Sequence, residues 1–198
     1  VLYGENGVVY RDEQAGELMG LSRVRSITQD DGHAFVTPDQ IKDEVKNIVS
    51  IIKDFYTELG MLNDNYWVSL SVMDPNTPEK YMNEGGIFEQ AESILEEIAK
   101  EENLPYKRIE GEAAFYGPKL DFQFKDALGR EWQLGTVQLD FSMPQRFELE
   151  YTDHNGEKQT PIMIHRAIAG SLERFMAVML EHFAGWLPLF LAPTQVSI

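Results

Sequence analysis

Apolar and polar residues alternate with a period of two in several segments of this chain, most clearly at residues 66–72 and 120–124. Such alternation predicts strands with one buried face and one polar face. Residues 8–11 and 21–28 are expected to form an antiparallel pair joined by the polar loop 12–20. Segments with helical spacing lie between and after the strands, so we predict an α+β domain, an antiparallel β-sheet flanked by helices.

Three helices are expected. The first begins at residues 37–40, where Thr, Pro and Gln form a capping-box start, and the second covers residues 87–102. The third is expected over residues 167–183, with the His165–Arg166 pair opening it. Further strands are expected at residues 130–139 and 162–164, with a hairpin between them at an Asn-Gly pair.

Composition excludes several classes of protein. Hydrophobic residues make up 43% of the 198 residues, enough for a packed core, and the absence of cysteine excludes disulfides and thiolate metal sites within the chain. A net charge of −16 argues against a chain that grips nucleic acid over its whole surface. No apolar stretch is long enough for a membrane span and no signal peptide is visible, so a cytoplasmic location is expected.

Several arginines lie close to strand ends. Arg11 and Glu13 follow the first strand of the expected pair, and Arg23 and Arg25 lie on the second. Because guanidinium groups bind phosphate in a bidentate manner, these residues either clamp a bent nucleoside triphosphate or are ordinary surface charges. No GxGxxG or Walker loop is present, so a nucleotide would have to bind without those cradles.

Polar residues at alternate positions are a second candidate. Gln29, Asp31 and His33 share one face at the end of a strand, and such groups are costly to bury unless they meet a ligand or each other. His33 is therefore either a metal ligand or a satisfied core histidine. His165 lies next to an arginine before the last helix, whose N-terminal end favours anions.

The middle of the chain adds polar residues near turns and glycines. Lys119 follows a tight turn and either contacts an anionic intermediate or simply ends a strand. Gln133 and Gln138 flank Gly135, and a glycine within a strand often lets a ligand or another stretch of backbone approach closely. The two glutamines either recognise such a ligand or have a structural role.

Together these segments resemble the catalytic domain of the threonyl-tRNA synthetase family, which are class II aminoacyl-tRNA synthetases. The resemblance runs from about residue 8 to residue 198 and rests on five ordered blocks: residues 11–25 (motif 2), 28–33, 115–119, 135–141 and 165–174 (motif 3). It implies a class II synthetase-like catalytic core that activates threonine with ATP and transfers it to tRNA(Thr).

The resemblance implies an ATP site made by motifs 2 and 3. Arg11 would contact the α-phosphate, Glu13 the adenine end, and Arg23 the outer phosphates of a bent ATP that carries Mg²⁺. Arg174 would stack on the adenine. Lys119 would lie near the reacting carboxylate and phosphate.

It also implies a zinc-dependent threonine pocket. His33 and His165 would be two of three protein ligands of Zn²⁺, with the third ligand outside this chain. Asp31 would accept the threonine hydroxyl proton, and Tyr116 and Gln29 would hold the amino group. Such a site discriminates against isosteric valine, because valine would leave its polar groups unpaired.

The remaining block implies contacts with the reacting groups and with the tRNA. Gln138 would lie beside the reacting carboxylate and phosphate, and Gln133 and Thr136 would lie towards the acceptor end of tRNA(Thr). The chain departs from the family pattern at Ser26 and Ile27, where Gly and Phe are usual, and at Met19, where His is usual.

The expected organisation is a partial catalytic domain over residues 1–190, followed at 191–198 by a linker and the first strand of a truncated anticodon-binding domain. Because a zinc ligand and the dimer-forming motif 1 would lie upstream, this piece is expected to be inactive alone and the full-length protein to be a homodimer. Two alternatives stay open: a non-catalytic paralogue that binds a partner or small molecule, and a class II enzyme for serine or proline.

Overall fold

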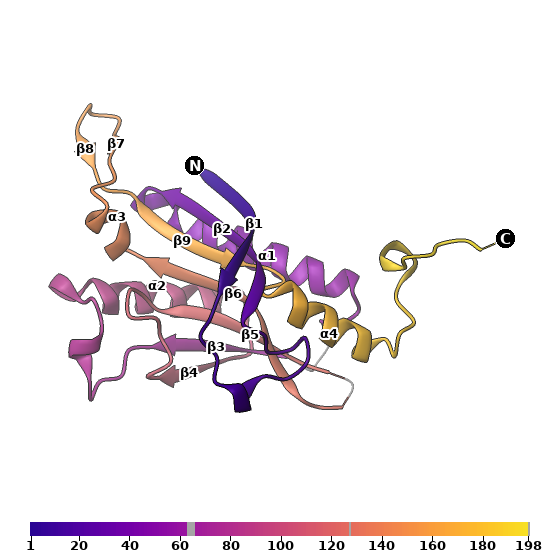
Figure 1. The fold of residues 1–198 in the computed structure, drawn as a ribbon. Coiled ribbons are helices and arrows are strands. Elements are labelled where there is room, and N and C mark those ends of the chain that lie inside the picture. The colour runs from indigo at the N-terminus through magenta and orange to yellow at the C-terminus, as the bar shows by residue number, and fades with distance from the viewer. Residues whose placement is uncertain (63–65, 127, 198) are drawn as a thin grey trace.

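A seven-stranded sheet organises the computed structural model, which describes residues 1–62, 66–126 and 128–197 (Figure 1). The strand order is β1-β2-β9-β6-β5-β3-β4, with only the β3–β4 pair parallel. The strands are β1 (Leu2–Tyr10), β2 (Ser26–Val36), β3 (Tyr66–Val72), β4 (Tyr106–Glu110), β5 (Lys119–Lys125), β6 (Glu131–Asp140) and β9 (Ile162–Ala167). A separate hairpin of β7 (Tyr151–Thr152) and β8 (Lys158–Gln159) projects from the sheet (Figure 1).

Two long helices cover one face of this sheet. Helix α1 (Ile41–Glu58) packs against β2, β6 and β9, and α2 (Ile87–Glu101) packs against β3 and β5 (Figure 1). The short α3 (Ser142–Arg146) follows β6, and α4 (Leu172–His182) packs against β2 and β6. No helix among the described residues is long and apolar enough to cross a membrane.

The hydrophobic core lies between the sheet and these helices. Alternate residues Leu120, Phe122 and Phe124 of β5 are at most 1% exposed, and each such side chain contributes about 1.5–3 kcal/mol by leaving water. Tyr56 of α1 stacks on Phe124 with ring centroids 3.9 Å apart and donates a hydrogen bond to the Ile168 carbonyl at 2.9 Å. Because period two puts successive side chains on opposite faces, the polar alternate positions of β5 lie on the other side of the sheet.

Most elements agree with the sequence analysis, including the α+β class itself. The capping box at Thr37 and Gln40 forms as predicted, although its first turn is a 3-10 turn (Pro38–Gln40) that leads into α1. The predicted strand at residues 66–72, the helix α2, the β5–β6 hairpin and the β7–β8 hairpin are also confirmed. Strand β4 and helix α3 were not predicted.

The second strand is a correction. Residues 21–28 were expected to form it, but β2 begins at Ser26 and continues to Val36, so Arg23 and Arg25 lie in the preceding turn. Strand β2 pairs with β1 along its whole N-terminal part and with β9 further on. Residues 26–34 pair with β1 and residues 32–36 with β9, so each residue of β2 has at least one paired neighbour. This backbone pairing stabilises as a strand a run that is too polar to show hydrophobic alternation.

The start of the last helix is another correction. His165 and Arg166 lie in β9, and α4 begins only after Ser171, whose side chain accepts a hydrogen bond from the Arg174 amide at 3.3 Å. Gly170 interrupts any earlier helix because its φ is +71°, a left-handed conformation that suits glycine. The backbone amides of residues 168 and 169 donate to Asp30 Oδ2 at 2.9 and 3.0 Å, which holds this segment against β2 ahead of the helix.

The structure also decides two smaller expectations. At Gly135 it is protein and not a ligand that comes close, because a Cβ there would lie 3.4 Å from the Ile168 carbonyl oxygen and 3.3 Å from Ile52 of α1, on the core side of the sheet. The strand expected from residue 191 is absent: a 3-10 turn at Leu189–Leu191 is followed by irregular chain to residue 197. The domain boundary near residue 190 stays a prediction.

Candidate active site

Polar side chains form a row across the sheet face that lies opposite α1 and α2. His33 of β2 pairs with His165 of β9, His165 with Gln138 of β6, and Gln138 with Lys119 of β5. We call these four residues the histidine row. Since the register places them side by side on four adjacent strands, segments far apart in the sequence meet at one level of the sheet.

The two histidines lie close together. Their ring centroids are 4.8 Å apart at an interplanar angle of 75°. His165 Nε2 lies 2.9 Å from Oδ2 of Asp140, a fully buried carboxylate whose Oδ1 accepts the backbone amides of Ser142 and Met143. Because an ionised carboxylate can only accept hydrogen bonds, this contact with Asp140 requires the His165 ring to carry a hydrogen on Nε2.

Burial shifts the pKa values of two side chains in this region, His33 and Tyr116. It lowers the pKa of His33, an effect that Asp31 opposes and that His165 reinforces. A lowered pKa favours the neutral imidazole, the form that ligates a metal. Tyr116 donates its hydroxyl hydrogen to Gln138 Oε1 at 2.8 Å, and burial followed by the charge of Asp140 raises the pKa of this phenol. Tyr116 thus remains a hydrogen-bond donor at neutral pH.

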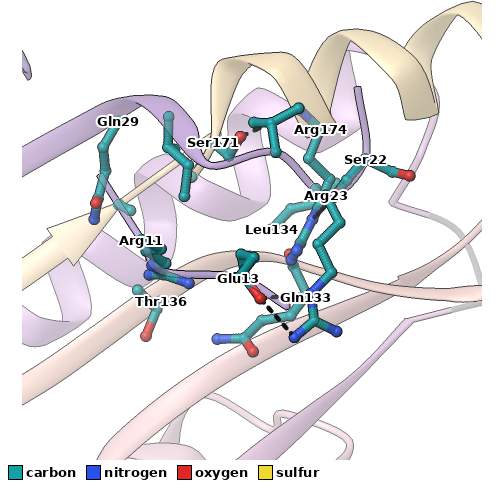
Figure 2. A pocket seen from close by; sticks show the side chains of 14 residues that line it. Arg11, Glu13, Ser22, Arg23, Gln29, Gln133, Leu134, Thr136, Ser171 and Arg174 are labelled. Atoms are coloured by element: carbon teal, nitrogen blue, oxygen red, sulfur yellow. Dashed lines mark hydrogen bonds and ion pairs between the residues drawn. The ribbon is translucent and has the colours of Figure 1, made fainter. Parts of the chain in front are cut away.

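The same region of the sheet holds a pocket lined by arginines, which Figure 2 shows from close by. It lies between the 11–24 segment, β2, β6 and the start of α4. We call it the arginine pocket, and seven of the predicted site residues line it: Arg11, Glu13, Arg23, Gln29, Gln133, Thr136 and Arg174. Gln29 and Thr136 lie on the side towards the histidine row, so the two regions are continuous along β2 and β6.

The pocket concentrates positive charge in an otherwise acidic chain of net charge −16. Burial, and then the charges of Arg11 and Arg23, lower the pKa of the Arg174 guanidinium, which donates to the Ser22 carbonyl at 2.9 Å. Arg23 is held by Glu13, with its Nε and Nη2 at 3.1 and 3.0 Å from Glu13 Oε2 (Figure 2). Neighbouring guanidiniums that destabilise one another favour binding of a polyanion.

The structure brings all the predicted site residues to this face. Asp31 lies on β2 between Gln29 and His33, one alternate position from each, and its charge acts on the His33 ring. Lys119 lies at the far end of the row, where its ammonium contacts the carboxylate of Asp121 at 2.6 Å. Arg166 is on the opposite face, held by Asp30 at 2.8 Å.

Three aspartates with structural contacts to this site were not predicted. Asp30 holds the chain before α4, Asp140 orients His165, and Asp121 contacts Lys119. Only Asp121 left a local signal, because Lys119 and Asp121 are two residues apart on a strand and so share a face. The partners of the other two lie on distant segments.

The histidine pair has the chemistry of two zinc ligands. Across residues 1–62, 66–126 and 128–197, no group of three or more His, Cys, Asp or Glu side chains is placed to hold a metal ion. Two adjacent imidazoles match the nitrogen ligands that Zn²⁺ prefers, and a tetrahedral site needs further ligands. The chain therefore fits zinc as a contributor of two ligands.

The fold and site define a class II synthetase core. The seryl-tRNA synthetase from Pyrococcus horikoshii, solved in complex with ATP, shares this fold with a TM-score of 0.62 at 13% identity, covering 92% of this chain and 33% of that one. Residues 3–183 match the model described as the tRNA synthetase class II core domain (G, H, P, S and T), and the chain belongs to that family.

The relatives with higher sequence identity carry the name of one member of this family. A threonine–tRNA ligase from Gloeobacter violaceus is 54% identical over 98% of this chain and 31% of its own length. The structure titled the RNA binding domain of threonyl-tRNA synthetase from Cryptosporidium parvum superposes with a TM-score of 0.89 at 40% identity, covering 98% of this chain and 47% of that one. The chain thus spans about a third of the length of the curated relative.

Proposed function

We propose that this chain is the adenylate-forming core of a threonine–tRNA ligase. In this reaction ATP and threonine form threonyl-adenylate and pyrophosphate, and the threonyl group then passes to tRNA(Thr). The observation that supports the proposal is the continuity of the arginine pocket with the histidine row, so that the proposed polyanion site would lie beside the proposed amino-acid site. Relatives with that name match nearly the whole chain, which supports the choice of threonine.

The arginine pocket is proposed to bind ATP. Arg11 would contact the α-phosphate, Arg23 the outer phosphates, and Arg174 would stack on the adenine, with Glu13 at the adenine end. The ion pair with Glu13 holds Arg23 at the pocket before nucleotide binds. This lowers the entropic cost of ordering the Arg23 side chain when the nucleotide binds. Mg²⁺ would enter with ATP and neutralise part of its charge.

The chemistry needs no protein nucleophile. A carboxylate oxygen of threonine attacks the α-phosphorus, and the bond to the bridging oxygen breaks as pyrophosphate leaves with the electron pair. Arg11 from one side and Lys119 from the other would stabilise the charge that builds up on the transferring group. Gln138, which is fixed by Tyr116, would orient the reacting carboxylate.

The histidine row is proposed to select threonine. His33 and His165 would hold Zn²⁺ together with a third ligand from outside these residues. When bound, the ion supplies Lewis-acid coordination for the amino and hydroxyl groups of threonine. Asp31 would accept the hydroxyl proton, and Gln29 and Tyr116 would hold the amino group.

The rest of the proposal concerns the whole protein. Gln133 and Thr136 of β6 line the arginine pocket, and the acceptor end of tRNA(Thr) would approach them there. A homodimeric full-length enzyme in the cytoplasm completes the proposal, on the basis of the family resemblance.

Threonine-dependent exchange of pyrophosphate into ATP by the full-length protein tests this function. We expect exchange with threonine and a rate at least about 100-fold lower with valine, because valine leaves the hydroxyl-binding groups unpaired. Exchange with serine or proline in preference to threonine would assign a different substrate. No exchange with any amino acid, by folded protein that contains zinc, would favour a non-catalytic role.

A further inference from the structure

We infer that Asp121 is a positioning residue of this active site, because its carboxylate holds three site side chains at once. The inference rests on the proposed function, which gives those side chains their roles. They come from both strands of the β5–β6 hairpin: Lys119, Gln133 and Thr136.

The contacts use both oxygens of the carboxylate fully. Oδ2 accepts from Lys119 Nζ at 2.6 Å and from Ser71 Oγ at 3.2 Å. Oδ1 accepts from Gln133 Nε2 at 2.7 Å and from Thr136 Oγ1 at 2.8 Å. Asp121 is 2% exposed, and a buried carboxylate is tolerated only when it is paired and hydrogen-bonded in this way.

A β-bulge makes this convergence possible. Asp121 pairs with Thr136, but the next register pair is Gln123 with Gln133, so β6 uses three residues where β5 uses two. In a regular strand, residues three apart point to opposite faces. The extra residue in β6 returns Gln133 to the face of Thr136, where both reach the same Asp121 oxygen.

The network also restrains Lys119 from the side of β3. Ser71 donates to Asp121, and Ser69 lies 2.9 Å from Ser71, both hydroxyls being buried. The carboxylate that contacts the Lys119 ammonium is therefore itself held by hydrogen bonds from Ser71, Gln133 and Thr136. Because Lys119 ends the histidine row beside Gln138, Asp121 fixes the distance between the row and the proposed tRNA-facing residues.

Asp121→Asn in the full-length protein tests the inference, with Asp126→Asn as a matched control. Asp126 follows the other end of β5, is likewise nearly buried, and also accepts four hydrogen bonds. Its donors are the amides of Leu128 and Arg130 and the side chains of Arg130 and Trp132, which lie outside the row and the arginine pocket. Both variants lose a buried charge, so general destabilisation affects them alike.

Kinetics per active site should separate the two variants. We expect D121N to lower kcat for threonine-dependent ATP–pyrophosphate exchange by about 10- to 100-fold, and D126N to stay within about 2-fold of wild type. In a Lys119→Met background the effect of D121N should shrink below about 3-fold, because Asp121 acts through Lys119 in this step. A D121N enzyme with wild-type kcat, or fully multiplicative effects, would overturn the inference.

The labelling rate of the Lys119 amine, measured by mass spectrometry, needs no activity. It should rise at least about 5-fold in D121N and stay unchanged in D126N, since only the first releases the ammonium. If wild type shows no exchange but D121N shows this rise, the proposed function fails and the positioning role stands. An unchanged rate in D121N removes the positioning role whatever the activity.

Asp121→Glu carries the test if D121N does not fold. It keeps the charge but displaces the carboxylate by one methylene, so kcat should fall by about 3- to 10-fold. Wild-type kcat in D121E would show that the position of this carboxylate does not matter.

Discussion

At the scale of single residues, Gly117 shows how closely the turn before β5 approaches β6. A Cβ at this position would lie 1.7 Å from the Leu139 carbonyl oxygen, which is backbone and cannot yield. The neighbouring Tyr116 bonds Gln138 of the same strand, so the close approach sets the position of this site residue.

Gly117→Ala should therefore lower the free energy of unfolding by about 2–4 kcal/mol, because the turn must separate from β6. Urea denaturation of the purified protein measures this. Gly16→Ala is the control, since a Cβ there meets nothing within 4 Å, and it should change stability by less than about 0.5 kcal/mol. Equal effects of the two substitutions would show that the turn adapts.

The sequence was enough to select residues of suitable chemistry, but it was not enough to predict which residues contact one another. His33, His165 and the arginines could be selected from the sequence because their side chains suit metals and phosphates. Asp140 and Asp30 could not, since each acts on residues far along the chain whose proximity depends on strand register. A sequence indicates which groups are useful, and the fold decides which carboxylate holds each of them.

At the scale of elements, the turn between β5 and β6 depends on Asp126. Burial alone would raise the pKa of Asp126, but hydrogen bonds from Arg130 and Trp132 outweigh it and lower the pKa to about 2, from an ordinary value of 3.8. The folded protein therefore binds the Asp126 proton more weakly than the unfolded chain does. The ionised carboxylate stabilises the fold above about pH 4, and this contribution is lost as the pH falls towards 2.

Wild-type protein should thus lose about 2 kcal/mol more unfolding free energy than Asp126→Asn between pH 5 and pH 2, because asparagine does not titrate. Chemical denaturation of both proteins across this range gives the comparison. Parallel pH curves for the two would mean that Asp126 does not contribute its charge to stability.

Elements with a strong hydrophobic periodicity were predicted correctly. Elements that depend on backbone pairing between strands were predicted with wrong bounds. Helices α1 and α2 have amphipathic periodicity, and a capping box precedes α1, so the sequence located both helices closely. Strand β2 was displaced and β9 shortened in the prediction, since backbone pairing on both sides stabilises polar segments as strands. These two strands carry the histidines, so the hardest elements to predict are the ones that build the site.

At the scale of the whole molecule, the sheet order joins residues that are distant in sequence. Placing β9 between β2 and β6 brings His165 beside His33 and Gln138. The α+β class could be predicted from the sequence, whereas this strand order could not, because it depends on which edges pair. The proposed zinc site exists only as a product of that order.

Metal analysis of the full-length protein tests this consequence. We expect about one zinc per chain in wild type and a strong loss of zinc in His33→Ala and in His165→Ala, since removing one of few ligands weakens binding greatly. His154→Ala is the control, because His154 lies exposed in the β7–β8 hairpin and should leave the zinc content unchanged. Full zinc content in both row variants would place the metal elsewhere.

The most direct measurement of the central claim is a crystal structure of the full-length protein with a non-hydrolysable threonyl-adenylate analogue. We expect the adenine to lie against Arg174, the phosphate mimic at Arg11, and the threonyl group beside His33 and His165. An analogue bound away from this sheet face, or bound there with its threonyl group turned away from the histidines, would contradict it.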